Sequence, residues 1–341
     1  MAVSIREVAA HAGVSVATVS NVLNRPEIVA QPTRDRVNAS IRQLNFVRNE
    51  SARQLRAGRS RTIGLVVLDV ANPFFTDLAR GVEDEASKAG LAVILCNSDD
   101  QERKEKRYLE LLEEHRVQGV LITPVAGAGS RLARLQRRGT PVVLVDSRSP
   151  LRGQCSVAVD DVLGGDVAIS HLLGAGHERI AYACGPPAVR QVADRREGAL
   201  RAFARAGRPA GDLEVIEAGA LNVAGGQKAG AEIAAMPPET RPTGVFCAND
   251  LIALGVLQEM TRNRIRVPEE VSIVGYDDID VAAAAAVPLT SVRQPRHQLG
   301  STAARLLLDE AAAGDSHQHR QVIFEPELVV RQSTQPAPPA T

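Results

Sequence analysis

The first 24 residues carry the pattern that most restricts how this chain folds. Apolar residues recur at helical spacing at Ile5, Val8, Ala9 and Ala12. Ser4 and Glu7 form a capping box that begins this helix, and Gly13 ends it with a left-handed turn. Ser15 caps a second helix, whose apolar residues are Val16, Val19, Val22 and Leu23. Two short helices joined by a Gly-containing turn predict a helix-turn-helix, with an ordinary helical hairpin as the alternative.

A helix-turn-helix places the N-terminal part of its second helix against base edges in the DNA major groove. Here that part offers Val16, Ala17 and Asn21 as base-reading residues. Asn21 is suited to bidentate pairing with adenine, and the two apolar residues are suited to thymine methyl groups. Thr18 and Ser20 are suited to hydrogen bonds with phosphate oxygens.

The charge of the chain is unevenly distributed. The whole sequence has 40 basic and 40 acidic residues, yet residues 1–60 have a net charge of +5 and the remainder −5. A basic head on an acidic body suggests a nucleic-acid-binding module, because neutralised phosphates supply most non-specific affinity. A solvated basic surface is the alternative interpretation. A third helix of this head is indicated by Pro32 near its start and by Val37, Ile41 and Leu44.

The body alternates between apolar strand-like runs and amphipathic helical runs. Strands are expected near 62–68, 91–95, 119–122, 141–145, 179–183, Val215, Val245 and 271–276, and helices near 74–88, 102–114, 162–173, 195–206 and 251–262. This alternation predicts parallel sheets with helices on both faces, in two doubly wound subdomains. The tail from Thr334 is rich in proline and is expected to be disordered.

Several motifs, in order along the chain, resemble those of the lactose and galactose repressor (LacI-GalR) family of bacterial transcription regulators. The head carries AGVS, ATVS, NVLN, TR, LN and ARQLRAG. The later matches, which continue to about Ser333, are Asn72-Pro73-Phe74-Phe75, Gly176-His177, Cys247-Ala248-Asn249-Asp250, Val274-Gly275-Tyr276-Asp277-Asp278 and Pro288-Leu289-Thr290 leading to Gln294. The chain departs from the family at Ala30-Gln31-Pro32, which lacks the usual Ser cap, and at Ala220 and Leu221, where an aromatic residue is common.

The resemblance implies a helix-turn-helix domain at 1–48, a hinge at 49–60, an effector-binding core at 61–333 and a tail at 334–341. The core would consist of an N-subdomain of 61–160 with 291–323 and a C-subdomain of 161–289 with 324–333. Three crossovers near Asp160, Thr290 and Phe324 would join them, with a small ligand between, as in periplasmic sugar-binding proteins.

The resemblance also implies a homodimer that binds a palindromic operator. In such a dimer two hinges pair, and each inserts a leucine, here Leu55, between base pairs of the minor groove. The expected DNA-binding residues are Ser4, Ser15, Val16, Ala17, Thr18, Ser20, Asn21, Asn24, Arg34, Arg53, Leu55 and Arg56. We expect ligand state to be converted into operator affinity by a two-state linkage through this hinge.

The effector cleft is expected beyond the carboxyl ends of the strands, where doubly wound sheets bind ligands. Polar residues at those ends are Asp69, Thr123, Asp146 with Arg148, Asn249 and Asp277. Phe74 or Phe75 offers an apolar face to a sugar ring, and the resemblance adds Arg195 and Gln294. The alternative for Asn249 and Asp277 is a helix cap. The run 191–195 is similar to that of ribose-type regulators and suggests a pentose.

The remaining motifs argue against other functions. The four cysteines show no CxxC and no His at ligand spacing, so reduced structural thiols, no metal site and no cofactor are expected. No G-x-S-x-G, H-E-x-x-H or P-loop pattern is present, which argues against an enzyme. The chain begins without a signal sequence and has no apolar run of membrane-spanning length, so a place in the cytoplasm, on the nucleoid, is expected. A soluble sugar-binding protein without a DNA role is the alternative.

Overall fold

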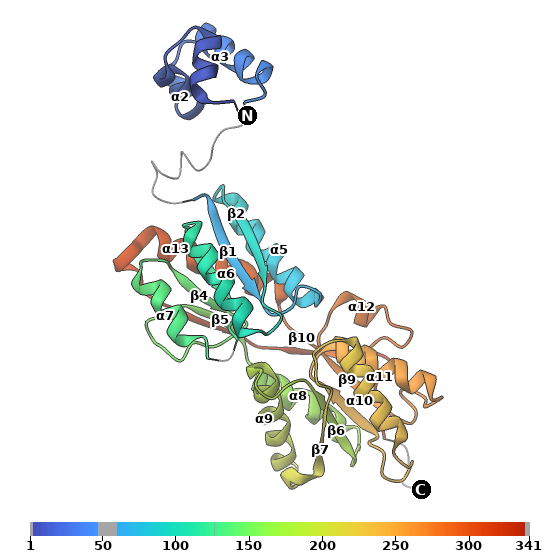
Figure 1. Ribbon diagram of the computed structural model, residues 1–341. Helices are drawn as coiled ribbons and strands as arrows, with labels where there is room; N and C mark the ends of the chain where they lie inside the picture. Colours follow the sequence, from blue (N-terminus) through green and yellow to red (C-terminus); the bar gives the residue numbers. More distant parts are fainter. Residues whose placement is uncertain (1–2, 47–59, 126, 338–341) are drawn as a thin grey trace. The chain divides into compact units, whose positions relative to one another are not determined.

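The structure is a computed structural model that describes residues 3–46, 60–125 and 127–337 (Figure 1). The chain divides into two compact units, Met1–Ser60 and Arg61–Thr341. The predicted hinge residues Arg53, Leu55 and Arg56 lie outside the described residues. Within the described ranges, no helix combines the length and apolar character needed to cross a membrane.

The first unit is a bundle of three helices, as predicted. Its elements are α1 (Ile5–Ala12), α2 (Val16–Asn24), a 3-10 turn η1 (Pro26–Ile28) and α3 (Gln31–Gln43). The predicted capping box is confirmed, because Ser4 and Glu7 exchange backbone-to-side-chain hydrogen bonds. Gly13 has a φ of 63°, and the Ser15 hydroxyl accepts a hydrogen bond from the Thr18 N–H. The third helix begins without a side-chain cap, as expected from Ala30.

A small apolar core holds the three helices together. Val8, Val19 and Val37, one from each helix, are fully buried. His11 Nδ1 lies 3.0 Å from the Ser40 hydroxyl and so links α1 to α3. The core therefore fixes the angle between α1 and α2 and leaves the outer face of α2 exposed.

The second unit contains two six-stranded sheets, each the centre of one lobe (Figure 1). The first sheet has the order β11-β5-β4-β3-β1-β2, and all its strands are parallel. Its strands are β1 (Thr62–Val67), β2 (Ala92–Asn97), β3 (Val120–Ile122), β4 (Val142–Val145), β5 (Ser156–Val159) and β11 (Gln321–Phe324). The second sheet has the order β12-β10-β9-β8-β6-β7, with only the edge strand β12 antiparallel. Its strands are β6 (Ile180–Cys184), β7 (Leu213–Glu217), β8 (Gly244–Cys247), β9 (Ser272–Asp277), β10 (Thr290–Arg293) and β12 (Glu327–Val329).

Helices cover both faces of the first sheet. They are α5 (Pro73–Lys88), α6 (Glu102–Glu114), α7 (Gly129–Arg137) and α13 (Arg296–Ala313). Leu65 and Val67 of β1 belong to the apolar cluster of α5 and α13, whereas Val66 belongs to that of α6 and α7. Alternate residues of one strand thus pack on opposite sides, as the period of a strand requires.

In the second lobe, glycines bring two helices into close contact. Its helices are α8 (Asp161–Gly174), α9 (Arg190–Arg205), α10 (Val223–Ala235), α11 (Asp250–Arg262) and α12 (Asp280–Ala283); short 3-10 turns are η2 (Ala210–Asp212) and, in the first lobe, η3 (Gly314–Ser316). A Cβ on Gly165 of α8 would overlap the backbone carbonyl of Arg195, and a Cβ on Gly198 of α9 would overlap that of Val162. This contact holds Arg195 of α9 against the start of α8.

The chain crosses between the lobes three times, after β5, between β10 and α13, and between β11 and β12. Two predicted lobe boundaries are wrong by a few residues. Residues 291–293 belong to the second lobe, because β10 pairs with β9. Phe324 belongs to the first lobe, because it pairs with Val159.

The prediction of disorder from Thr334 onward is wrong for residues 334–337. The Thr334 hydroxyl lies 2.9 Å from His171 Nε2, the Gln335 carbonyl 3.1 Å from His177 Nε2, and the Ala337 N–H donates to the Ala175 carbonyl. These bonds fix the segment along the end of α8. Local composition did not predict them because every partner is distant in the sequence.

Candidate functional site

The outer face of α2 presents polar and small apolar side chains to solvent. Val16, Ala17, Asn21 and Asn24 are exposed. Asn21 makes no side-chain hydrogen bond to any described residue of the head, whereas Asn24 donates to the Ser20 carbonyl at 2.8 Å. Asn21 is therefore the amide on this face whose donors and acceptors are both available to a base edge.

The other predicted DNA-binding side chains of the head take part in its internal contacts. The Ser4 and Ser15 hydroxyls accept capping hydrogen bonds, and Thr18 Oγ1 lies 2.9 Å from Ser15 Oγ. The Arg34 guanidinium donates to the Pro26 carbonyl at 3.2 Å and also to the Gln31 side chain. Each still has an exposed or half-exposed position from which a phosphate can be reached.

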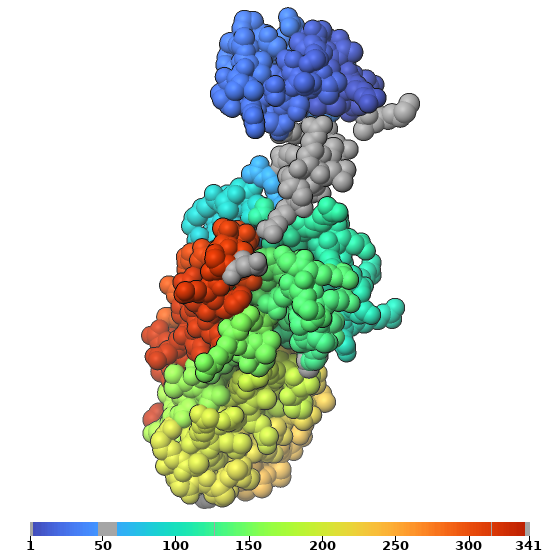
Figure 2. Space-filling model, turned by 90° about the vertical axis from the view of Figure 1, so that its left-hand side faces the viewer, coloured from blue at the N-terminus to red at the C-terminus, as the bar shows by residue number. Residues whose placement is uncertain are grey.

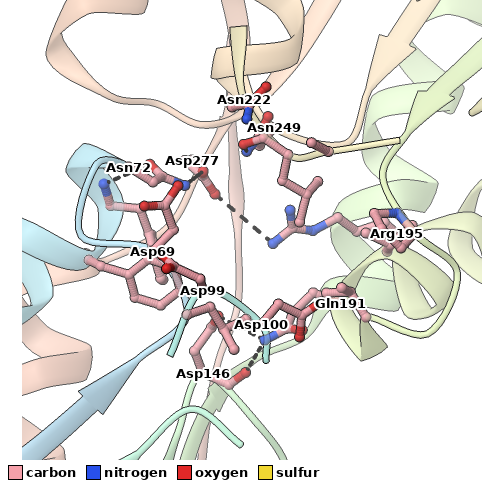
Figure 3. Close-up of a pocket in the computed structure, with 18 of the residues that line it drawn as sticks. Asp69, Asn72, Asp99, Asp100, Asp146, Gln191, Arg195, Asn222, Asn249 and Asp277 are labelled. Atoms are coloured by element: carbon pink, nitrogen blue, oxygen red, sulfur yellow. Dashed lines mark hydrogen bonds and ion pairs between the residues drawn. The ribbon is translucent and has the colours of Figure 1, made fainter. Parts of the chain in front are cut away.

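The second unit contains a cavity of about 370 Å³ between its two lobes (Figure 3). Eight of the ten residues predicted for the cleft line it, namely Asp69, Phe74, Phe75, Asp146, Arg195, Asn249, Asp277 and Gln294. They come from the carboxyl ends of strands, from the helix starts that follow, and from the crossover after β10. The rule for doubly wound sheets thus located the cavity correctly.

Arg195 is buried, and neighbouring groups satisfy its charge. Its Nε donates to Asp161 at 2.8 Å, its Nη2 lies 4.0 Å from Asp277 Oδ1, and another N–H donates to the Ala248 carbonyl. The guanidinium also lies 3.6 Å from the centre of the Tyr276 ring. Arg195 is therefore already neutralised by the protein.

Asp277 joins both lobes and the crossover. It receives hydrogen bonds from Gln294 Nε2 at 2.7 Å and from Asn72 Nδ2 at 3.4 Å, the latter across the cleft. Its φ of 104° lies in a region that L residues seldom adopt, and this strained backbone turns the carboxyl toward the cavity (Figure 3). Burial raises the pKa of the Asp277 carboxyl to about 6, although Arg195 and Gln294 act in the opposite direction.

A second bridge between the lobes joins Asp146 and Gln191. The Gln191 amide donates to the Asp146 carbonyl at 2.6 Å and to its Oδ2 at 2.9 Å. Oδ1 of Asp146 is buried and has no hydrogen-bond partner among the described residues. Burial raises the pKa of the Asp146 carboxyl well above its usual range, and the Asp161 carboxylate raises it further. The cavity thus contains a carboxyl group with one oxygen bonded to Gln191 and the other without a hydrogen-bond partner among the described residues.

The lining is rich in carboxyl groups. Five aspartates face one arginine in it: Asp69, Asp99, Asp100, Asp146 and Asp277. Two phenylalanines, Phe74 and Phe75, add an aromatic edge, with their rings 5.0 Å apart and at 81°. The loop 219–222 lines the cavity without an aromatic side chain. The arrangement suits a ligand that donates many hydrogen bonds.

Two predicted residues lie elsewhere. Thr123 is buried at the end of β3, where its N–H donates to the Val66 carbonyl, and its side chain does not reach the cavity. Arg148 lies 3.1 Å from Asp160 and lines a separate cavity beside α7. The carboxyl end of a strand places residues near the cleft, but the direction of the following loop decides which ones enter it.

The sequence-based list missed Asn72, Asp99, Asp100, Gln191 and Asn222. Asp99 and Asp100 lie in the turn just after β2, so the strand-end rule would have found them. Asn72 and Asn222 cap α5 and α10, and their side chains face the cavity from these helix starts (Figure 3). Gln191 is on the first turn of α9, which gives no sequence signal of its own.

Comparisons with known proteins match both units. Residues 4–49 match the model described as bacterial regulatory proteins, lacI family, and residues 169–334 match a periplasmic binding protein-like domain. The chain is 34% identical over 333 residues to the HTH-type transcriptional repressor PurR of Photobacterium profundum, covering 97% of this chain and 98% of that protein. It is 31% identical to a LacI family transcriptional regulator from Enterococcus faecium with bound ribose, with a TM-score of 0.74 over 81% of this chain and 99% of that one. The lac repressor dimer bound to operator and the anti-inducer ONPF is 26% identical, with a TM-score of 0.84 over 98% of this chain and 100% of that one.

Proposed function

The chain belongs to the lacI family of bacterial regulatory proteins and is a DNA-binding repressor with an effector-binding core, and we propose that a neutral monosaccharide, such as a pentose, switches its affinity for a palindromic operator. The relatives are repressors and not enzymes. The proposed effector binds between the two lobes of each protomer of a homodimer.

The charge of the cavity carries the proposal for the effector. Five aspartates face Arg195, whose charge Asp161 and Asp277 already balance. A phosphate or carboxylate in this cavity would meet like charges with no unpaired cation, which costs energy in a site of low dielectric constant. Sugar hydroxyls instead donate hydrogen bonds to the carboxyl oxygens, including the unpartnered Oδ1 of Asp146. A cavity of about 370 Å³ is within the range for a small ligand.

The aromatic edge and one relative support a pentose. Phe74 and Phe75 supply apolar surface on one side of the cavity, suited to the C–H face of a sugar ring. The regulator from Enterococcus faecium, 31% identical to this chain, was solved with bound ribose.

For DNA, we assign base reading to Asn21, Val16 and Ala17 on the exposed face of α2. The lac repressor, similar in fold over nearly the whole chain, was solved as a dimer bound to operator. The contributions of Arg53, Leu55 and Arg56 rest on the sequence, because these residues lie outside the described ones.

The two bridges across the cleft supply a route for switching. Asn72 to Asp277 and Gln191 to Asp146 join opposite walls of the cavity. An effector that hydrogen-bonds to the same groups changes the free-energy difference between the open and closed arrangements of the two lobes. If the closed core is the one that holds two heads at the spacing of two operator half-sites, this change alters the affinity for the operator. Ligand and operator are then coupled by reciprocal linkage.

The test is calorimetry of the full-length protein with ribose, arabinose, xylose, ribose 5-phosphate and a nucleoside. We expect a neutral pentose to bind and the phosphate ester to bind at least tenfold more weakly, since about 1.4 kcal/mol of repulsion already gives that factor. Fluorescence anisotropy with labelled operator then measures the effect of the pentose on DNA affinity.

Ribose 5-phosphate binding as tightly as ribose would contradict the proposed effector class. A His115→Ala variant, changed at an exposed residue at the end of α6, serves as the control and should respond like the wild type. DNA affinity that stays constant between low and high salt would contradict operator binding by the basic head.

A further inference from the structure

A cluster of metal-ligating side chains lies in the first lobe, away from the effector cavity. Cys155, Glu310, His317 and His319 place one ligand atom each within 4.8 Å of one another. Cys155 Sγ lies 3.2 Å from His317 Nε2 and 3.7 Å from His319 Nδ1, and His319 Nδ1 lies 3.9 Å from Glu310 Oε2. The sequence predicted no metal site, because these residues belong to three separate segments.

The spacing of these atoms matches a single tetrahedral ion. Ligands at the usual zinc bond lengths stand about 3.3–3.6 Å apart at the corners of a tetrahedron. Three of the six separations, 3.2, 3.7 and 3.9 Å, lie near these edges, and all four atoms lie within 4.8 Å of one another. We expect side-chain adjustments of about an ångström to bring all four atoms to one ion.

The fold orients the ligands before any ion binds. Cys155 immediately precedes β5, and His317 and His319 precede the neighbouring strand β11, so that parallel pairing holds the segments together. The Arg320 N–H donates to Cys155 Sγ at 3.4 Å, a contact suited to a thiolate. His317 and His319 are two residues apart, and their rings lie 5.2 Å apart.

Glu310 supplies a carboxylate whose buried oxygen has no hydrogen-bond donor in the described part of the chain. It lies in the last turn of α13, where the helix dipole favours a cation and disfavours a carboxylate. Its Oε2 is buried and has no hydrogen-bond partner among the described residues. A bound cation would satisfy this oxygen and the dipole together.

We propose that Cys155, Glu310, His317 and His319 form a binding site for a divalent transition-metal ion, with Zn²⁺ as the best match. One thiolate, two imidazoles and one carboxylate are the ligand types that zinc prefers in a closed four-ligand site. Mg²⁺ and Ca²⁺ are disfavoured, because they require mostly oxygen ligands. On binding, Cys155 releases its thiol proton to solvent.

The position of the site indicates a structural role. It lies at the amino-terminal ends of β5 and β11, the opposite end of the sheet from the effector cavity. Figure 2 shows α13 and the segment after it, in red, at the surface of the first lobe beside green segments. The ion would join α13 to the two strands that lead into lobe crossovers, and this site is independent of the proposed effector.

The test is Zn²⁺ binding to the full-length protein after treatment with a chelator. We expect mass spectrometry and calorimetry to give one Zn²⁺ per chain. Cobalt substituted for zinc should give visible bands of tetrahedral Co²⁺ and a near-ultraviolet sulfur-to-cobalt charge-transfer band. A chain that takes up no stoichiometric Zn²⁺ would overturn the site, and the histidines would then only hydrogen-bond to the thiol.

Variants locate the ion. Cys155→Ser should abolish the charge-transfer band. His319→Ala, at an exposed position, should weaken Zn²⁺ binding by at least roughly 10- to 100-fold, which is the loss typical of removing a residue that only hydrogen-bonds to a metal ligand. Cys96→Ser, at a buried thiol of the same lobe, is the matched control and should bind like the wild type. Equal Zn²⁺ affinity in wild type, Cys155→Ser and His319→Ala would place the metal elsewhere and refute the proposal.

Discussion

The DNA-binding head and the effector cleft use polar side chains in opposite ways. On α2 the polar residues proposed to read bases are exposed, and Asn21 has no partner among the described residues of the head. In the cleft, Arg195, Asp277 and Asp146 are at least 95% buried and bonded to other protein groups. Substitution of the unpartnered Asn21 should therefore change binding alone, whereas substitutions in the cleft should change binding and stability together.

Arg195→Met should have the largest effect. Without the guanidinium, Asp161 and Asp277 remain buried without their cation, and breaking a buried ion pair costs about 3–5 kcal/mol of unfolding free energy. Urea unfolding measures the stability, and calorimetry with the bound pentose measures the loss of effector binding. Arg201→Met on the same helix is the control, because its ion pair with Glu197 is exposed and should contribute less than about 1 kcal/mol. If Arg195→Met has the same unfolding free energy as Arg201→Met, the claim that cleft residues stabilise the fold more than surface residues is wrong.

The pH dependence of stability should have opposite signs in the two regions. Burial raises the pKa of Asp277 from 3.8 to about 6, so the folded core binds a proton more tightly than the unfolded chain. This contribution is fully present below about pH 4 and is lost as pH rises through 6, a change of roughly 3 kcal/mol. Denaturant unfolding from pH 4 to 8 should show this loss, and Asp277→Asn should remove it.

In the head, hydrogen bonds from the Ser4 backbone and hydroxyl lower the pKa of Glu7. Stability from this group is present above its unfolded pKa and is lost as pH falls through the folded value. The hydrogen-exchange protection of α1, measured relative to the intrinsic exchange rate at each pH, should therefore decrease on acidification. An α1 that becomes more protected in acid would contradict the assignment.

Asn21→Ala should weaken specific operator binding by about 1–3 kcal/mol without changing stability or binding to random DNA. The reason is that the Asn21 side chain is exposed and makes no hydrogen bond to the described part of the head. Anisotropy on operator and random DNA measures the difference, with Asn38→Ala at an exposed position of α3 as the control. Equal losses on both DNAs would make Asn21 a phosphate contact.

Ser15→Ala should have the smallest effect. It removes the cap that accepts the Thr18 N–H at 3.0 Å, which costs about 1 kcal/mol of head stability. Ser15→Asn keeps an acceptor at the cap and should restore stability, as followed by thermal unfolding of the helical signal. If the asparagine variant is stable but binds operator poorly, the Ser15 hydroxyl also contacts DNA.

Local sequence patterns predicted the three helices of the head and many elements of the body, but not α7, α10, α13 or the strands β5, β10, β11 and β12. The capping box at Ser4 and the turn at Gly13 were predicted because their partners are three or four residues away. Helix α10 was missed because it contains Gly225, Gly226 and Gly230, which lower helix propensity. Gly226 and Gly230 are needed for contact with α11, since a Cβ on Gly226 would overlap the Ile252 carbonyl and a Cβ on Gly230 would overlap the Glu259 side chain.

The sequence predicted those residues of the candidate site whose positions are set by the carboxyl end of a strand. Asp277, Asp146 and Asp69 lie at the carboxyl ends of strands and were found, whereas Gln191 depends on a partner 45 residues away in sequence, Asp146. The cluster of Cys155 and His317 spans 162 residues, so no spacing rule detects it. Contacts between two segments that are distant in the sequence can be found only once the three-dimensional fold is known.

The order of segments in the first lobe has a consequence for synthesis on the ribosome. Helix α13 and strand β11 follow all of the second lobe except β12 in the chain, yet β11 completes the first sheet and α13 covers β4 and β5. Until α13 (Arg296–Ala313) leaves the ribosome, the apolar faces of Val143, Val145 and Val157 lack this covering helix. Such exposed apolar surface is where nascent chains meet chaperones or aggregate. Translation therefore completes both lobes almost together, and a chain that stops before Arg296 has no finished effector cavity.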